Sequence, residues 1–158
     1  MHRLPVPLRR LGYRTAYAML RVYWFVRRPH LIGVKCVLTF RDQLLLVRHT
    51  YGHSTWDLPG GSVRRGEPPA ETAQREMEEE LGVQVTDWRA LGEIRTRMYH
   101  KLDTLYCFQA ELPSRSVTVE PAELADAQWF PLGELPPDLS RYVRPILRRL
   151  QPGRQNSA

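Results

Sequence analysis

The sequence predicts a mixed α/β domain in which helices cover both sides of a β-sheet. Strand-like apolar runs occur both before and after one strongly helical segment at residues 68–81. At 158 residues the chain is long enough for a single compact domain with a sizeable core. Hydrophobic residues make up 42% and charged residues 25%, so the composition places the chain among soluble globular proteins.

Residues 1–30 are expected to form a basic, amphipathic helix that precedes this domain. Arg14 and Arg21 interrupt its apolar run, which makes it too charged for a transmembrane helix, and no small-residue cleavage site follows as in a signal peptide. We expect the helix to pack on its own domain or on the partner in a homodimer; the alternative is a helix on an anionic membrane surface. One side of the helix would carry Tyr13, Tyr17, Leu20 and Trp24.

Two strands are predicted next, at residues 31–40 and 43–49, joined by a tight polar turn at Arg41–Asp42. A loop-rich segment follows, and Pro59 with the two glycines after it forces a turn. The helix at residues 68–81 then has a clear signal at each end. Two prolines suit its first turn, where a missing N–H group costs nothing, and a glycine follows its last residue as a C-cap.

The second half of the chain contains further strands. Residues 87–99 and 101–112 are strand-like and predict a long hairpin around His100–Lys101, and residues 127–132 predict another short strand.

The C-terminal segment, residues 132–150, is expected to be helical in part, with Pro145 starting or kinking the last helix. Residues 31–150 would then form the main domain, and residues 151–158 a disordered tail.

The net charge of +6 conceals a division along the chain. Residues 1–35 carry eight basic residues and no acid, and residues 139–158 carry five arginines and no acid, so residues 36–138 are acidic overall. An acidic centre suits a cation site, and basic ends suit anionic surfaces. Cys36 and Cys107 lie in apolar runs without a metal-ligand partner at short spacing, so we expect buried thiols in a reducing, cytoplasmic compartment.

Three glutamates of the predicted helix point to a metal site. At about 100° per residue, Glu76, Glu79 and Glu80 share one face of the helix, beside the apolar face that would pack on the sheet. Such carboxylates repel one another unless a divalent cation binds them, and Mg²⁺ prefers oxygen ligands. A solvated acidic face is the alternative, which the neighbouring Gly60–Gly61 and Glu67 make less attractive.

The spacing of these residues resembles the complete signature of the Nudix hydrolase family, the Nudix box, over residues 61–83. The fixed positions are filled by Gly61, Glu67, Arg75–Glu76–Met77, Glu79–Glu80 and Gly82–Val83. The flanking stretches WDLPGG and AQWFPLGELP are also similar to those that commonly surround that box, so the resemblance covers about residues 31–137.

The resemblance implies an α/β/α sandwich with a mixed sheet that hydrolyses the pyrophosphate bond of a nucleoside diphosphate linked to another group, with Mg²⁺ or alternatively Mn²⁺. Carried over by position, Glu76, Glu79 and Glu80 would be both catalytic residues and metal ligands. The Gly60 carbonyl would add a ligand, Arg75 would orient the carboxylates as a catalytic residue, and Glu67 would be a weaker ligand.

The residues that contact substrate are less defined by the sequence. Arg48, His53 and Trp56, together with His49 and Tyr51, precede the box and suit phosphate contacts and base stacking; core packing or surface charge is the alternative for each. A second basic and aromatic cluster comprises Arg95, Arg97, Tyr99, His100 and Lys101. The general base is Glu79 or Glu80, or one of Glu93, Asp103, Glu120, Glu123 and Asp126.

The expected substrate is a small nucleotide, either a nucleoside triphosphate or a nucleotide sugar. Two alternatives stay open: a Nudix module that senses a nucleotide without cleaving it, and a pyrophosphohydrolase tethered to a membrane by its first helix. A few exposed arginines are thin evidence for nucleic acid, so a nucleic-acid partner is not expected, although RNA 5′ ends stay open.

Overall fold

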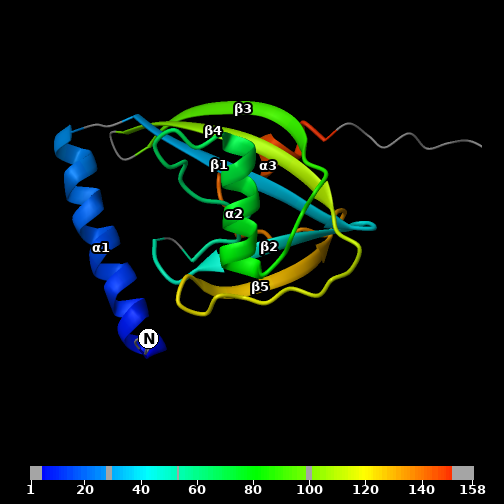
Figure 1. The fold of residues 1–158 in the computed structure, drawn as a ribbon, viewed down its shortest axis with the longest axis horizontal. Helices are drawn as coiled ribbons and strands as arrows, with labels where there is room; N and C mark the ends of the chain where they lie inside the picture. The colour runs from blue at the N-terminus through cyan, green and yellow to red at the C-terminus, as the bar shows by residue number, and fades with distance from the viewer. Residues whose placement is uncertain (1–4, 28–29, 53, 99–100, 151–158) are drawn as a thin grey trace, which may run out of the picture.

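The structure is a computed structural model that describes residues 5–27, 30–52, 54–98 and 101–150. The predicted tail at residues 151–158 lies outside the described residues. Figure 1 shows a twisted sheet with one helix in front of it, a short helix behind it and a long N-terminal helix at its side.

Five strands form one mixed sheet in the order β3-β4-β1-β2-β5. The central strands β1 and β4 run parallel, whereas the other neighbouring pairs are antiparallel. The predicted mixed α/β fold is therefore confirmed. The bounds of the strands are β1 His30–Phe40, β2 Gln43–His49, β3 Arg89–Met98, β4 Lys101–Glu111 and β5 Leu124–Pro131.

Helices cover the two faces of this sheet, with α2 (Pro69–Leu81) on one face and α3 (Val143–Leu147) on the other. Successive side chains of β2 point to opposite faces of the sheet and so reach different hydrophobic clusters. Leu45 packs in the cluster under α2, and Leu46 packs in the cluster under α3. Both leucines are fully buried. A strand that is covered on both faces reads as a continuous apolar run, which explains the unbroken Leu-Leu-Leu-Val of this segment.

The helix α2 begins and ends as its sequence signals predict. Pro68 is its N-cap, and Gly82 ends it in the left-handed conformation at φ 64°. The N–H of Gly82 donates to the carbonyl of Glu78, which satisfies one of the last carbonyls of the helix. Its buried side carries Ala73, Met77 and Leu81, so this side faces the sheet.

The downstream elements differ in length from their predictions. β3 and β4 form the predicted hairpin, with Met98 opposite Lys101; the residues between them lie outside the described part. α3 has only five residues and contains Pro145, so this proline lies in the first turn of a short helix and does not kink a longer one. Val143 and Ile146 anchor this helix in the core as fully buried residues.

A loop from later in the chain lies between β1 and β2 beyond their connecting turn. The strands pair directly only beside that turn. Further along, residues 57–63, here called the wedge loop, lie between them. The N–H of Val34 in β1 donates to the carbonyl of Gly61 at 2.8 Å, and Asp57 exchanges both backbone hydrogen bonds with Val47 of β2 at 2.9 Å. The wedge loop thus continues the hydrogen bonding of the sheet across the gap.

The N-terminal helix α1 (Val6–Arg27) is present as predicted and lies beside the domain (Figure 1). Of the predicted apolar side, Tyr13 and Tyr17 contact the domain, with ring centroids 6.1 Å and 5.5 Å from that of Tyr51. Leu20 is 45% exposed, and the side chain of Trp24 lies outside the described part. No helix among the described residues is both long and apolar enough to cross a bilayer.

The C-terminal segment should contribute to the stability of the domain. Ile146→Ala removes a fully buried side chain and should lower the free energy of unfolding by about 2–5 kcal/mol, measured by urea denaturation. The control Arg148→Ala alters an exposed residue of the same segment and should change stability by less than about 0.5 kcal/mol. Equal, small effects of the two substitutions would contradict the observed packing of α3.

Candidate active site

The wedge loop brings two glycines against β1 and α2. Gly60 has a φ of 149°, and a Cβ at this position would overlap the carbonyl oxygen of Val34. A Cβ at Gly61 would overlap the carboxylate of Glu76, which projects from α2. Only glycines therefore allow the loop to pass between the strand and this carboxylate.

Two carboxylates of α2 are buried beside these glycines. Glu76 is 9% exposed and Glu80 is 2% exposed. Burial raises the pKa of Glu80 to about 8, and the neighbouring Glu76 adds to this, while the Gly60 N–H donates to Glu80 at 3.3 Å and opposes it. Burial also raises the pKa of Glu76, against the charge and hydrogen bond of Arg75. Two buried carboxylates side by side, both with raised pKa values, would ionise more readily with a cation between them.

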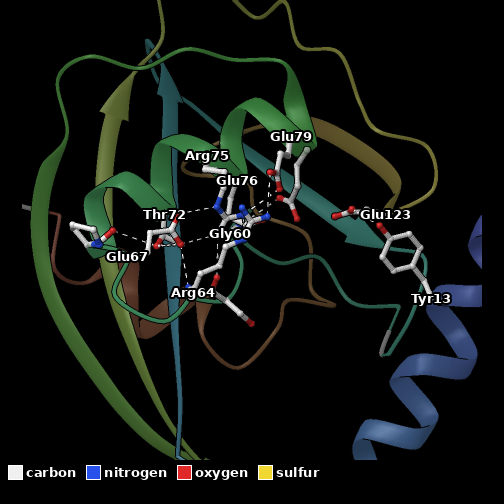
Figure 2. A network of polar contacts seen from close by, with 12 residues as sticks. Tyr13, Gly60, Arg64, Glu67, Thr72, Arg75, Glu76, Glu79 and Glu123 are labelled. Atoms are coloured by element: carbon white, nitrogen blue, oxygen red, sulfur yellow. Dashed lines mark hydrogen bonds and ion pairs between the residues drawn. The ribbon is translucent and has the colours of Figure 1, made fainter. Parts of the chain in front are cut away.

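Arg75 lies among three carboxylates, as Figure 2 shows. Its Nε and Nη2 atoms donate to Glu67 at 2.8 Å and 3.0 Å, and its Nη1 atom donates to Glu76 at 2.7 Å and to Glu79 at 3.1 Å. Arginine is suited to this position because its planar fork can serve several oxygens at once. The arginine therefore fixes the positions of the glutamates around it.

Glu67 supports Arg75 and the start of α2. The Thr72 hydroxyl donates to it at 2.8 Å and the Arg64 N–H at 3.1 Å. The hydrogen bonds from Arg75 lower the pKa of Glu67 to about 2, so it is ionised at neutral pH. Both of its oxygens accept hydrogen bonds, so Glu67 supports Arg75, and its role as a weaker metal ligand stays a prediction.

The carboxylates of α2 are suited to a divalent cation, although their side chains do not converge on one point. Across the described ranges, no three His, Cys, Asp or Glu side chains converge as a ready-made metal site. Glu76 and Glu80 are nevertheless buried with raised pKa values, and Glu79 is exposed beside them with 48% of its side chain accessible. Oxygen donors of this kind, next to a loop backbone that approaches closely, match the preferences of Mg²⁺.

Lys35 holds the wedge loop from β1. Its Nζ atom donates to the carboxylate of Asp57 at 2.7 Å and to the carbonyl of Leu58 at 2.9 Å. Burial alone would raise the pKa of Asp57, but the charge and the hydrogen bond of Lys35 outweigh it and lower that pKa. The sequence did offer a signal for this residue, because Lys35 is the single charged residue in an otherwise apolar strand.

Two hollows extend from the glycines towards α1. The inner hollow, of about 230 Å³, is lined by Gly60, Gly61 and Lys35 among others. The outer hollow, of about 330 Å³, is lined by Tyr17 and Arg141 among others. Both are also lined by His49, Tyr51 and Tyr142. They therefore adjoin and lead from the acidic helix to α1, with a size suited to a small ligand.

His49 lies where the two hollows meet. Burial lowers the pKa of His49 to about 4, the charge of Lys35 adds to this, and Asp57 opposes it. Its Nδ1 atom is buried and has no hydrogen-bond partner within the described part of the chain. A neutral imidazole with an unused nitrogen can bind a polar group of a ligand.

The predicted substrate contacts are placed differently. Trp56 is 5% exposed and packs edge-on against Phe130 at 5.0 Å, so it is a core residue and does not face a ligand. Arg48 stacks over the Trp56 ring at 4.4 Å and pairs with Asp138, so it braces the same part of the core. His53 lies outside the described residues. The placement of Trp56 corrects its expected role, whereas Arg48, with 34% of its side chain exposed, stays a prediction as a phosphate contact.

The second predicted cluster is only partly described. Arg95 pairs with Glu93 at 2.8 Å on β3. Tyr99 and His100 lie outside the described residues, as does the side chain of Lys101.

Among the predicted bases outside the helix, Glu123 has a charge that affects the pKa values of the buried glutamates. Its charge raises the pKa of both Glu76 and Glu80. It lies in the turn before β5 and accepts a 2.6 Å hydrogen bond from the Tyr13 hydroxyl of α1 (Figure 2). By contrast, Glu120 forms an ion pair with Arg9.

The fold and the site together define a class of protein: an α/β domain with an acidic site where a glycine loop meets one helix. The NUDIX domain model matches residues 29–150, and the chain therefore belongs to the Nudix family.

Curated relatives match parts of the chain. The ADP-ribose pyrophosphatase of Mycobacterium tuberculosis is 48% identical over 50 residues, which cover 31% of this chain and 24% of that protein. The NAD-capped RNA hydrolase NudC of Pseudomonas aeruginosa is 33% identical over 111 residues, which cover 69% of this chain and 39% of that protein. The chain thus spans less than half the length of these relatives.

Solved structures agree with the fold. A MutT NUDIX hydrolase from Burkholderia pseudomallei superposes with a TM-score of 0.72 at 25% identity, covering 77% of this chain and 98% of that one. A UDP-X diphosphatase superposes with a TM-score of 0.64 at 28% identity, covering 75% of this chain and 62% of that one.

His49 should make stability depend on pH. A histidine in the unfolded chain has a pKa of about 6.5, whereas folding lowers that of His49 to about 4, so the unfolded chain takes up the proton first. The contribution of His49 to the free energy of unfolding should therefore fall by up to roughly 3 kcal/mol as the pH drops from about 6.5 to about 4. Glu80, whose pKa is raised, contributes in the opposite sense over part of this range, so the contribution of His49 is taken as the difference between the wild type and His49→Gln in urea denaturation. This difference should shrink as the pH drops, and an NMR pKa near 6.5 for His49 would contradict the prediction.

Gly61 should be required for cation binding. Gly61→Ala places a Cβ against the Glu76 carboxylate and should weaken Mn²⁺ binding, measured by calorimetry, by about tenfold or more. Gly133→Ala has open space around it and serves as the control, with unchanged affinity. Equal affinities of the two variants would show that Glu76 need not keep its present position.

Proposed function

We propose that this protein is a Mg²⁺-dependent pyrophosphohydrolase that acts on a nucleoside diphosphate linked to another group. The observation that carries the proposal is the buried pair Glu76 and Glu80, set beside Gly60–Gly61 and fixed by Arg75. A structural helix has no need for two buried, adjacent carboxylates, because each costs free energy unless a cation compensates it. The family membership and the names of the relatives support the same reaction class.

In this proposal Glu76, Glu79 and Glu80 hold the metal, with the Gly60 carbonyl as a further ligand. The bound metal would screen phosphate charge and lower the pKa of the attacking water. Arg75 orients Glu76 and Glu79 through its hydrogen bonds, and Glu67 keeps Arg75 in place.

Glu123 is the proposed acceptor of the proton of the attacking water. It faces the buried carboxylates from outside the helix, whereas Glu76 and Glu79 are already engaged by Arg75. The Tyr13 hydroxyl orients Glu123 by donating to one of its oxygens, which leaves the other to accept a proton.

The substrate would extend from the metal through the inner hollow into the outer one. Tyr17, Tyr51 and Tyr142 offer aromatic faces for a planar ring, Arg141 offers positive charge and His49 a hydrogen bond. A nucleoside triphosphate and a nucleotide sugar both suit this arrangement. The relatives named for ADP-ribose and UDP-X favour a substrate with a second group beyond the diphosphate.

Phosphate release with Mg²⁺ should be measured across nucleoside triphosphates, nucleotide sugars and dinucleotides, adding a phosphatase where the products are monophosphates. Glu79→Gln should lower turnover at least about a hundredfold, because it removes a proposed ligand at an exposed position where the fold tolerates the change.

Glu78→Gln is the matched control, since Glu78 is exposed on the same helix and accepts a hydrogen bond from Gln84. Its turnover should equal that of the wild type. If no compound is cleaved while nucleotides still raise the melting temperature, the hydrolase proposal fails in favour of a nucleotide sensor.

A further inference from the structure

Helix α1 has one face against the domain. The Tyr13 hydroxyl donates to Glu123 at 2.6 Å, and Arg9 pairs with Glu120 at 3.0 Å. Tyr17 lies against Gly52, beside Tyr51, where a Cβ would come within 3.3 Å of the Tyr17 hydroxyl. These contacts fix which side of the helix points away from the domain.

The opposite face of α1 is apolar and exposed. At about 100° per residue its large apolar residues fall within an arc of about 120°, wide enough for a continuous stripe. None of them faces the contacts with the domain. They are Leu8 (51% exposed), Leu11 (56%), Met19 (75%), Val22 (67%) and Tyr23 (49%).

Arginines border this stripe. The helix contains five arginines and no acidic residue. On the helix circumference Arg14 lies about 60° and Arg21 about 80° beyond Leu11, and both are exposed. At the other border Arg9 lies about 40° beyond Tyr23, where its ion pair with Glu120 holds it on the domain. An apolar stripe with a basic border is typical of a helix that lies in the plane of a membrane interface.

We propose that the outer face of α1 lies on an anionic membrane surface, with its apolar stripe among the acyl chains and the bordering Arg14 and Arg21 at the headgroups. Charge decides between this surface and a second copy of the chain. Two such helices packed face to face would offer no acidic residue to Arg14 and Arg21, whereas anionic lipid complements them. The helix would lie flat, in keeping with its inability to span a bilayer.

Flotation of the full chain with lipid vesicles tests the proposal. We expect binding to vesicles of phosphatidylcholine and phosphatidylglycerol, weaker binding to phosphatidylcholine alone, and release as salt is raised. The double variant Met19→Glu with Val22→Glu should weaken binding by about tenfold or more, because it puts charge in the stripe. Both side chains are largely exposed, so the melting temperature should not change.

The control is Ser114→Glu with Leu132→Glu, which adds the same charge at exposed positions away from α1. It should bind anionic vesicles nearly as well as the wild type. Equal loss in both double variants would overturn the proposal, because net charge alone would then explain binding. Failure to bind vesicles would also overturn it, and light scattering that shows a dimer broken by the α1 variant would assign the face to a second copy.

Discussion

The wedge loop between β1 and β2 is the constraint on which the site depends. Direct pairing of these strands stops after their turn, and the loop replaces it with backbone hydrogen bonds to both strands. This places Gly60 against the carbonyl of Val34 and Gly61 against the carboxylate of Glu76, where no side chain fits. The sheet therefore determines how closely the loop backbone approaches the acidic side of α2.

Burying carboxylates at this junction has a cost in stability, and the surrounding residues limit it. An unpaired charge in a protein interior is penalised by several kcal/mol. Arg75 offsets the charge of Glu76 from the solvent side, and the Gly60 N–H donates to Glu80. Lys35 neutralises Asp57 and so holds the loop itself, and its charge also opposes the raised pKa of Glu80. The raised pKa of Glu80 shows that compensation is incomplete, as expected where a site is built to accept a cation.

Local sequence patterns were sufficient to predict the helices and strands. They could not predict the roles of side chains whose contacts are distant in sequence. The apolar run of β2 and the end signals of α2 are local, and both elements formed where predicted. Trp56 illustrates the failure, because the same ring suits a substrate or a core, and only its packing on Phe130 decides. Glu123, the proposed proton acceptor, could not be chosen from five acids, since its place depends on a hydrogen bond across 110 residues.

Helix α1 joins the proposed membrane surface to the proposed active site. Tyr13 contacts Glu123, Tyr17 lines the outer hollow, and the stripe on the opposite face of the same helix is exposed. A rigid helix cannot move one face without the other, so a membrane that fixes α1 would also fix the wall of the hollow and the orientation of Glu123. Such coupling is reciprocal: a ligand that binds better when Tyr17 is in place must strengthen the membrane binding of the helix by the same factor.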